Sequence, residues 1–492
     1  MAYNRGHAAE FAEYPVEDAM DASLTLAENV VATQYNDIPD DVVEITKLDI
    51  LDTIGVALAG SAAHGVDPVG NLIREWGGKA ESTVLVHGHR VPAPNAALIN
   101  GLMARALDYD NTYYVPFVCH IGVNVVPAAL AMAERKGKVH GRDFITAVAL
   151  GEDLMVRLGL ARKRWFGDRP VFAGGTYPPF LINVMQYRAN FGAAAAAGKI
   201  LGLDTDRMVD ALGLAYTQCA NEVQSTEDGA YSKRLPTAMT ARAGVMAALF
   251  AEGGLTGPKN CLEGRFGLFK TFEDGGYIRE VLTEQLGHRF EGLNLAFKLY
   301  PFCRGGHTAL DATLSLVNEH NIHRQDVEAI TVDIGPVFYG MMCEPLEFKQ
   351  KPRSIVDAQF SIPYAVAAAV VDREAGLRHL TERAIARGDL LEVARKVTPR
   401  LRSDIKPGSS EETRSTVTIQ TRQGQTFSKT VDVCRGRPEN PASQDELFRK
   451  FRTCAEVAAK PLPRNQVEDA IGLLTDLQNV DDVTRIIRLL VA

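Results

Sequence analysis

Residues Ala106–Pro127, ALDYDNTYYVPFVCHIGVNVVP, form a polar interruption between two apolar segments with helical spacing. The upstream segment is PNAALINGLMARA (94–106), and the downstream segment is VVPAALAMAE (125–134). Each polar side chain alone fits a helix cap or a buried core residue, but a loop between core helices lines a cleft, where titratable groups acquire shifted pKa values. The set therefore predicts a functional site on a helical framework, with these side chains: Asp108, Asp110, Thr112, Tyr113, Tyr114, Cys119 and His120.

Helical spacing extends over most of the first half of the chain. ITKLDILDTIGVAL (45–58) places its apolar residues on one stripe, and Gly60 after it is typical of a helix stop. Helices are also predicted over 144–160, over the Ala-rich FGAAAAAGKILGL (191–203) and over TAMTARAGVMAALFAEG (237–253). The short alternating stretch STVLVHGHRVP (82–92) predicts a small hairpin.

The pattern changes near residue 290. AITVDI (329–334) and TVTIQ (416–420) have the alternation of strands, Gly424 predicts a hairpin after the second, and helices are predicted over 359–371 and 390–396 between them. After the Pro-rich CRGRPENPAS (434–443) the chain becomes helical again. The pattern predicts a mainly α protein: an all-helical domain formed by both chain ends (1–292 and 438–492) and an inserted α+β domain (293–437).

Composition excludes several classes of function. The 492 residues carry a net charge of −8 without basic clusters, which gives no electrostatic footprint for nucleic acid or anionic lipid. No apolar run approaches the ~18 residues of a membrane span, and the N-terminus lacks the apolar core of a signal peptide, so a cytoplasmic protein is expected. Seven cysteines without CxxC pairing favour free thiols over disulfides or structural zinc.

Two lysines have unusual surroundings. Lys233 in AYSKRLP and Lys298 in NLAFKLYPFC lie among small or apolar residues shortly before a proline. Desolvated lysines bind carboxylates strongly, although structural salt bridges are an equally good interpretation of each lysine alone. Together with the 106–127 stretch they predict a site for a polyanionic organic acid. No phosphate-binding glycine loop is present, and the HxxxD spacing of His307 and Asp311 is a weak metal signal, so no cofactor or metal is expected.

Six ordered blocks resemble the MmgE/PrpD family over nearly the whole chain. They are DILDTIGVALAGS, ALDYDNT with the His before VVPAAL, FGAAAAAGKILGL, SKRLPTAMTARAGVMAALFAEGGLTGP, FKLYPFCRGGHTALDA and DAQFSIPYAVAAAV. The family includes 2-methylcitrate dehydratase, cis-aconitate decarboxylase and iminodisuccinate epimerase. The resemblance implies a homodimer in which the inserted domain is a lid over the active site. It also implies cofactor-free chemistry on di- and tricarboxylates.

The resemblance carries over residue by residue. The family's Asp-x-x-x-Thr corresponds to Asp108 and Thr112 as substrate-binding residues, its first-loop His to His120, and its two site lysines to Lys233 and Lys298. A second His of family dehydratases and decarboxylases is absent here. The position is predicted to be held by Asn183, as a substrate-binding residue, or by a tyrosine, with Tyr177 preferred over Tyr187 because its Tyr-Pro-Pro context is closest to the family's aromatic-His-Pro loop.

The predicted chemistry is proton transfer at a carbon next to a carboxylate. Such a carbon is barely acidic, so fixed positive charge from Lys233 and Lys298 must stabilise the dianion that forms, with His120 and Tyr177 as catalytic acid/base groups and Asp108 placed to set the His120 tautomer or to bind substrate. We expect a lyase, most simply a dehydratase. An epimerase, a decarboxylase and a catalytically silent carboxylate-binding scaffold are the alternatives.

Overall fold

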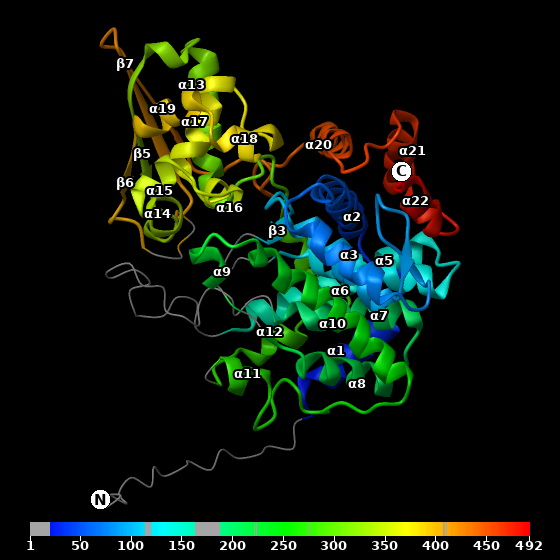
Figure 1. Cartoon of the computed structure of the whole chain (residues 1–492). Coiled ribbons are helices and arrows are strands. Elements are labelled where there is room, and N and C mark those ends of the chain that lie inside the picture. The colour runs from blue at the N-terminus through cyan, green and yellow to red at the C-terminus, as the bar shows by residue number, and fades with distance from the viewer. Residues whose placement is uncertain are drawn as a thin grey trace, which may run out of the picture.

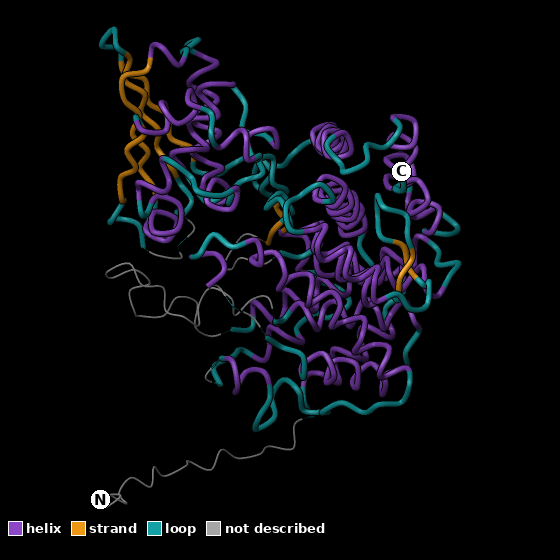
Figure 2. The backbone as a smooth tube through the Cα atoms, viewed as in Figure 1, coloured by secondary structure: helices purple, strands orange, loops and turns teal. Residues whose placement is uncertain are grey.

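The computed structural model describes residues 20–113, 120–162, 187–220, 222, 224–273, 275–406, 409 and 411–492 (Figure 1). Most of the described chain is helical, as the sequence predicts, and its largest sheet has four strands and lies in the C-terminal region (Figure 2). Among the described helices none has the length and hydropathy needed to cross a membrane.

Tightly packed helices build the first half of the chain. Glycines allow the close approach: a methyl group on Gly60 would collide with the Met103 carbonyl, and one on Gly244 would collide with Ala193. Gly60 therefore ends its helix at a contact between backbones, not in a left-handed cap. The longer helices are α1 (Ala22–Ala32), α2 (Asp40–Gly60), α3 (Val66–Trp76), α4 (Ala93–Arg105), α5 (Gly122–Lys136), α6 (Gly141–Leu160), α7 (Ala189–Leu201), α8 (Thr205–Tyr216) and α10 (Leu235–Glu252).

Shorter elements connect these helices. The predicted hairpin is present, because β1 (Ser82–Thr83) pairs antiparallel with β2 (Arg90–Val91). A second two-stranded ribbon joins β3 (Thr112–Tyr113) to β4 (Leu295–Ala296) and pairs Thr112 with Ala296. This ribbon brings the 106–127 stretch beside the segment that contains Lys298. The short helices in this part of the described chain are η1 (Tyr35–Asp37), α9 (Gln224–Glu227), η2 (Tyr231–Arg234), α11 (Leu268–Phe272), α12 (Arg279–Thr283) and η3 (Glu291–Asn294).

The four-stranded sheet has the order β6-β5-β7-β8. Both predicted strands and the hairpin at Gly424, whose φ is +80°, are confirmed, whereas β6 was not predicted and pairs parallel to β5. The predicted helix over 359–371 is two helices, because Ser361 caps the second one by accepting a bond from the Tyr364 amide. The strands are β5 (Val327–Ile334), β6 (Val397–Leu401), β7 (Ser415–Thr421) and β8 (Thr426–Val431). The helices are α13 (His307–Glu319), α14 (Pro336–Cys343), α15 (Leu346–Gln350), α16 (Ile355–Gln359), α17 (Ile362–Asp372), α18 (Glu382–Ile385) and α19 (Gly388–Arg395).

The buried apolar residues divide between the two regions. One cluster runs from Ala22 to Phe297 and continues from Leu447 to Leu490, while separate clusters fill the sheet region between Phe302 and Ile419. The last helices, α20 (Gln444–Glu456), α21 (Arg464–Thr475) and α22 (Thr484–Leu489), thus belong to the first core, and Figure 1 shows α20 beside α2. The domain boundaries at 292 and 437 stay a prediction.

Candidate functional site

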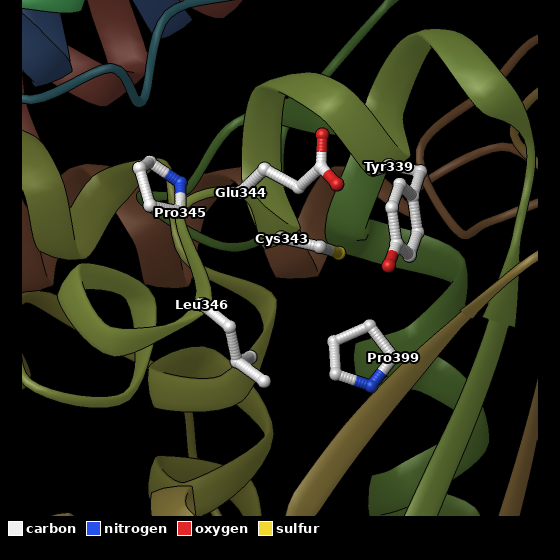
Figure 3. Close-up of a pocket in the computed structure, with 6 residues that line it drawn as sticks. All are labelled: Tyr339, Cys343, Glu344, Pro345, Leu346 and Pro399. Carbon is white, nitrogen blue, oxygen red and sulfur yellow. The ribbon is translucent and has the colours of Figure 1, made fainter. Parts of the chain in front are cut away.

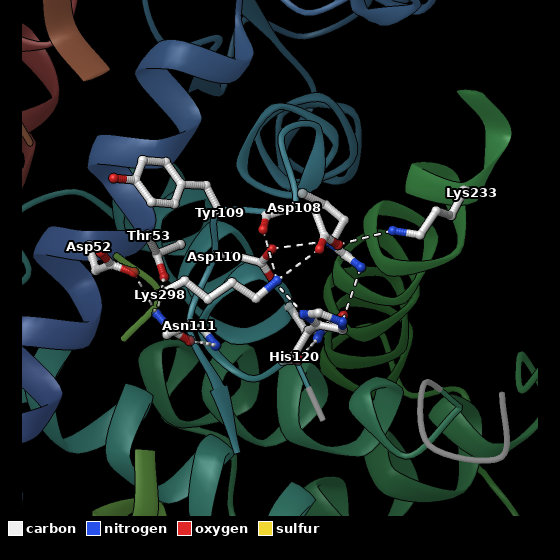
Figure 4. A network of polar contacts seen from close by, with 12 residues as sticks. Asp52, Thr53, Asp108, Tyr109, Asp110, Asn111, His120, Lys233 and Lys298 are labelled. Atoms are coloured by element: carbon white, nitrogen blue, oxygen red, sulfur yellow. Dashed lines mark hydrogen bonds and ion pairs between the residues drawn. The ribbon is translucent and has the colours of Figure 1, made fainter. Parts of the chain in front are cut away.

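Arg105, the last residue of α4, is the centre of a buried charged cluster. Figure 4 labels the other members of the cluster, which are Asp108, Asp110, His120, Lys233 and Lys298. Arg105 Nη1 lies 2.6 Å from Asp108 Oδ1 and 3.0 Å from Asp110 Oδ1, and its Nη2 lies 3.0 Å from His120 Nε2. Only 5% of Arg105 is exposed, and neither carboxylate is more than 3% exposed. Helix α4 therefore ends by fixing three polar side chains of the following loop.

The contacts of His120 define its tautomer. A guanidinium can only donate, so Nε2 accepts from Arg105, and Nδ1 must carry the proton that it donates to Asp110 Oδ2 at 2.6 Å. Burial and the Arg105 charge lower the pKa of His120 to about 4. The imidazole is therefore neutral near pH 7. Asp110, and not Asp108 as the sequence suggested, is the carboxylate that sets the tautomer.

Asp108 lies among three cations. Its Oδ1 accepts from Arg105 and from Lys233 Nζ at 3.0 Å, and its Oδ2 accepts from Lys298 Nζ at 3.0 Å. Burial raises the pKa of this carboxyl, but Lys233, Lys298 and Arg105 together outweigh burial and hold the pKa well below its usual range. The backbone at Asp108 has φ +52°, the left-handed conformation that Asp tolerates better than most residues. This turn directs the carboxylate toward both lysines.

The two lysines differ in how fully they are engaged. Lys298 Nζ also donates to the Asp108 carbonyl at 2.8 Å, and its side chain is 4% exposed. Lys233 Nζ has one hydrogen-bond acceptor, Asp108, among the described residues and lies 4.2 Å from the centre of the Phe360 ring; its side chain is 11% exposed. Burial and the Arg105 charge lower the pKa of Lys233 to about 8. Among the described residues, Lys233 thus has two N–H groups left to offer to a ligand, and Lys298 has one.

A second buried polar layer lies behind this cluster, on α2 and α6. Asn111 donates to Asp49 and Asp52, which are no more than 2% exposed, and accepts from the Gly122 amide at 3.3 Å. Burial raises the pKa of Asp49 to about 6. Burial and the Asp49 charge also raise the pKa of Glu152 well above its usual value, so a proton is held within this acidic pair. This layer holds the loop through Asn111, whose side chain is not part of the charged cluster around Arg105.

The structure brings together most of the residues that the sequence singled out. Asp108, His120, Lys233 and Lys298 belong to one network, and Thr112 lies next to it on β3. The Thr112 hydroxyl is buried and has no hydrogen-bond partner among the described residues.

Of the three candidates for the second acid/base position, the structure describes Tyr187, and its side chain does not join the network. Tyr187 is buried elsewhere: its hydroxyl donates to Glu273, and its ring stacks on Phe272 at 4.7 Å. Tyr177 and Asn183 lie outside the described residues, as do Tyr114 and Cys119.

The metal signal at His307 and Asp311 has a structural explanation. The His307 ring contacts the Phe302 carbonyl at 3.1 Å, while Asp311 accepts from the Tyr300 hydroxyl at 2.6 Å. In the part of the chain that the structure describes, no three His, Cys, Asp or Glu side chains are grouped as metal ligands. A cavity of about 360 Å³ lies in the sheet region, and none of the predicted site residues lines it (Figure 3). Its lining residues are Tyr339, Cys343, Glu344, Pro345, Leu346 and Pro399.

Two family models and several curated relatives match this chain. Residues 24–280 match the MmgE/PrpD N-terminal domain, and residues 300–472 match the MmgE/PrpD C-terminal domain. A cis-aconitate decarboxylase of Aspergillus terreus is 28% identical over 480 residues, which cover 92% of this chain and 93% of the relative. The cis-aconitate decarboxylase of Homo sapiens is 27% identical over 464 residues, with 92% and 90% covered. That of Mus musculus is 26% identical over 472 residues, with 93% and 91% covered.

Proposed function

The chain belongs to the MmgE/PrpD family, and from this premise we propose that it is a lyase that acts on a small di- or tricarboxylic acid by proton transfer at a carbon next to a carboxylate. One observation carries the proposal: three buried cations face only two carboxylates, and the most exposed cation, Lys233, retains N–H groups for a ligand. This excess of positive charge in a desolvated site is suited to an organic anion.

The cluster assigns different tasks to its members. Lys233 binds a substrate carboxylate, and Lys298 with Arg105 holds Asp108 while contributing fixed positive charge. When charge develops on the carbon beside that carboxylate, preorganised cations stabilise it more than they stabilise the ground state. Because the pKa of Lys233 is lowered to about 8, its ammonium is also a competent proton donor near neutral pH.

We place decarboxylation of an unsaturated tricarboxylate first, because the relatives matched over more than nine tenths of this chain are named cis-aconitate decarboxylases. The C–CO₂ bond at the allylic carbon breaks and its electron pair forms a new double bond. The old double bond supplies a pair to the carbon next to a second carboxylate, and one proton is added there as CO₂ leaves. Dehydration is the reaction expected from the sequence. It would begin with loss of the proton from the carbon next to a carboxylate, and the resulting dianion would then lose a β-hydroxyl group.

A reaction panel in D₂O tests this proposal. Purified protein, treated with a chelator, is incubated with cis-aconitate and with hydroxy di- and tricarboxylates and followed by NMR. We expect CO₂ release with one deuterium in the product, or water loss from a hydroxy acid. Lys233→Met should lower the rate by ~100-fold or more, whereas Lys259→Met, which removes an exposed ion pair with Asp210, should not.

Other outcomes would overturn the lyase. Exchange of the α-proton with inversion and no elimination would establish an epimerase. A thermal shift on adding an acid, without turnover or exchange, would establish a silent carboxylate-binding protein. Activity that disappears with the chelator and returns with a divalent metal would contradict the proposed role of the protein's own cations.

A further inference from the structure

Lys450, on the C-terminal helix α20, reaches the site from the far end of the sequence. Its Nζ lies 2.7 Å from Asp52 Oδ1, 2.7 Å from the Tyr109 carbonyl and 2.9 Å from the Lys298 carbonyl. Two of its N–H groups donate to the carbonyls, and its positive charge pairs with Asp52. Because only 6% of the residue is exposed, Lys450 acts through the groups that it contacts.

The two carbonyls belong to the segments that carry the site charges. Tyr109 follows Asp108 directly in the chain, and the other carbonyl is that of Lys298 itself. The Lys450 ammonium therefore links the backbones of the two segments whose side chains, Asp108 and Lys298, are hydrogen-bonded to each other. The Tyr109 hydroxyl adds a bond to the Leu299 carbonyl at 3.2 Å, and its ring centre lies 4.0 Å from Lys450 Nζ. The left-handed turn at Asp108 needs such support, because an unusual backbone conformation persists only where its surroundings fix it.

Asp52 makes this arrangement possible. It lies on α2, is 2% exposed, and supplies the negative charge that allows an ammonium to be buried there. It also accepts from Asn111 at 3.4 Å, so α2, the site loop and α20 meet at one ion pair.

We propose that Lys450 is a positioning residue: by bridging the Tyr109 and Lys298 carbonyls it fixes the Lys298 ammonium against Asp108 in the geometry that the reaction requires. The expected effect on kcat rests on the proposed function, since its measurement needs a substrate that turns over. The expected effect on the distance between Lys298 and Asp108 does not depend on that function.

The decisive variant is Asp52→Asn with Lys450→Met. Lys450→Met alone leaves Asp52 buried without a cation and should fail to fold, whereas the double variant removes both charges and should cost less stability. We expect kcat to fall by about tenfold or more, because a displacement near 1 Å can cost ~100-fold. KM should change by less than about threefold, since Lys233 is untouched. A double variant with a kcat within about twofold of the wild type would overturn the proposal.

Two further variants separate positioning from stability. Phe451→Leu loosens the packing of α20 on Gly55 of α2 without removing a hydrogen bond; it should lower the melting temperature and leave kcat unchanged. Asp52→Asn alone keeps both carbonyl bonds but leaves the ammonium buried without its counter-charge, so it should melt at a lower temperature than the double variant. A tenfold loss of kcat in Phe451→Leu would assign the effect to stability instead of positioning.

A crystal structure of the double variant supplies a readout without substrate. The Lys298 Nζ to Asp108 Oδ2 distance, 3.0 Å in the native chain, should lengthen by about 1 Å or more, the scale of displacement that matters for catalysis. An unchanged distance would overturn the positioning role of Lys450 whether or not a substrate has been found. The absence of turnover with every tested acid would count against the proposed function alone.

Discussion

At the scale of single residues, the chemistry open to each side chain of the site depends on which of its hydrogen-bonding atoms already have a partner. The Nε2 lone pair of His120 accepts from Arg105, so the imidazole can take a proton from a substrate only if that contact opens. Lys233 needs no such rearrangement, because its N–H groups are only partly used and burial has already lowered its pKa to about 8. Between the two groups, Lys233 is better prepared to bind and protonate an anion.

The pH dependence of kcat/KM follows from these pKa values. A rate that needs the Lys233 ammonium should be flat below pH 8 and fall about tenfold per pH unit above it, because deprotonation removes the charge. His120, with a pKa of about 4, should add no break between pH 5 and 8. The measurement is a profile of initial rates from pH 5 to 10.

Lys233→Arg is the matched control for this profile. Its guanidinium stays charged throughout the range, so the variant should be slower but should lose the alkaline decline. A decline that persists in Lys233→Arg would assign the alkaline pKa to another group.

The sequence predicted the lysines, the imidazole and Asp108 from composition and resemblance, but not how they interact. Arg105 was missed because it is the last residue of an apolar helix, and a basic residue is common in the last turn of any helix. The separate tasks of Asp108 and Asp110 follow from the positive φ of Asp108, which no spacing rule reveals. Lys450 lies 341 residues from Tyr109 in an ordinary amphipathic helix, and only the fold brings it to the site.

At the scale of elements, the long helices and the hairpin of β1 and β2 were predictable, but the strands β3, β4 and β6 were not. Apolar periodicity over a dozen or more residues is a strong signal, whereas β3 and β4 have two residues each and no period to detect. Strand β6 contains Pro399, which normally argues against a strand; its place at the edge of the sheet accommodates the missing N–H. Helix α5 begins at Gly122, where the close approach of α2 leaves no room for a side chain.

Gly122→Ala tests that close approach. A methyl group there would overlap Thr53 Oγ1 and the Asp49 carboxylate of α2, so the helices must separate. We expect the free energy of unfolding to fall by ~1–3 kcal/mol, measured by urea denaturation.

Gly472→Ala in α21 is the control for this substitution. No atom lies within 4 Å of its added methyl group, so it should stabilise the protein by roughly 0.5–1 kcal/mol through helix propensity alone. Equal effects of the two substitutions would exclude the packing explanation for Gly122.

At the scale of the whole molecule, the chain closes its first core with its last helices. Apolar residues from Leu447 to Leu490 join the cluster begun at Ala22, and Phe451 packs against Gly55 of α2. The sheet region between them has cores of its own. The first core therefore requires both ends of the chain.

A chain that stops at Arg437 should not fold cooperatively. It would expose the apolar face of α2 that α20 covers and would lose the ion pair between Asp52 and Lys450. Circular dichroism and thermal melting of the truncated chain check this expectation. Co-expression of residues 438–492 should restore a cooperative melt, and a cooperative melt without them would show that α20–α22 are dispensable.

The bridge made by Lys450 also has a consequence for synthesis on the ribosome. The lysine emerges 341 residues after Tyr109, which at roughly 5–20 residues per second is a delay of about 20–70 s. Throughout that interval the nascent α2 helix carries Asp52 without its cation. The proposed catalytic geometry can therefore form only after Lys450 has been synthesised, and a chain that stalls or is released before that point would lack it even if its first helices had formed.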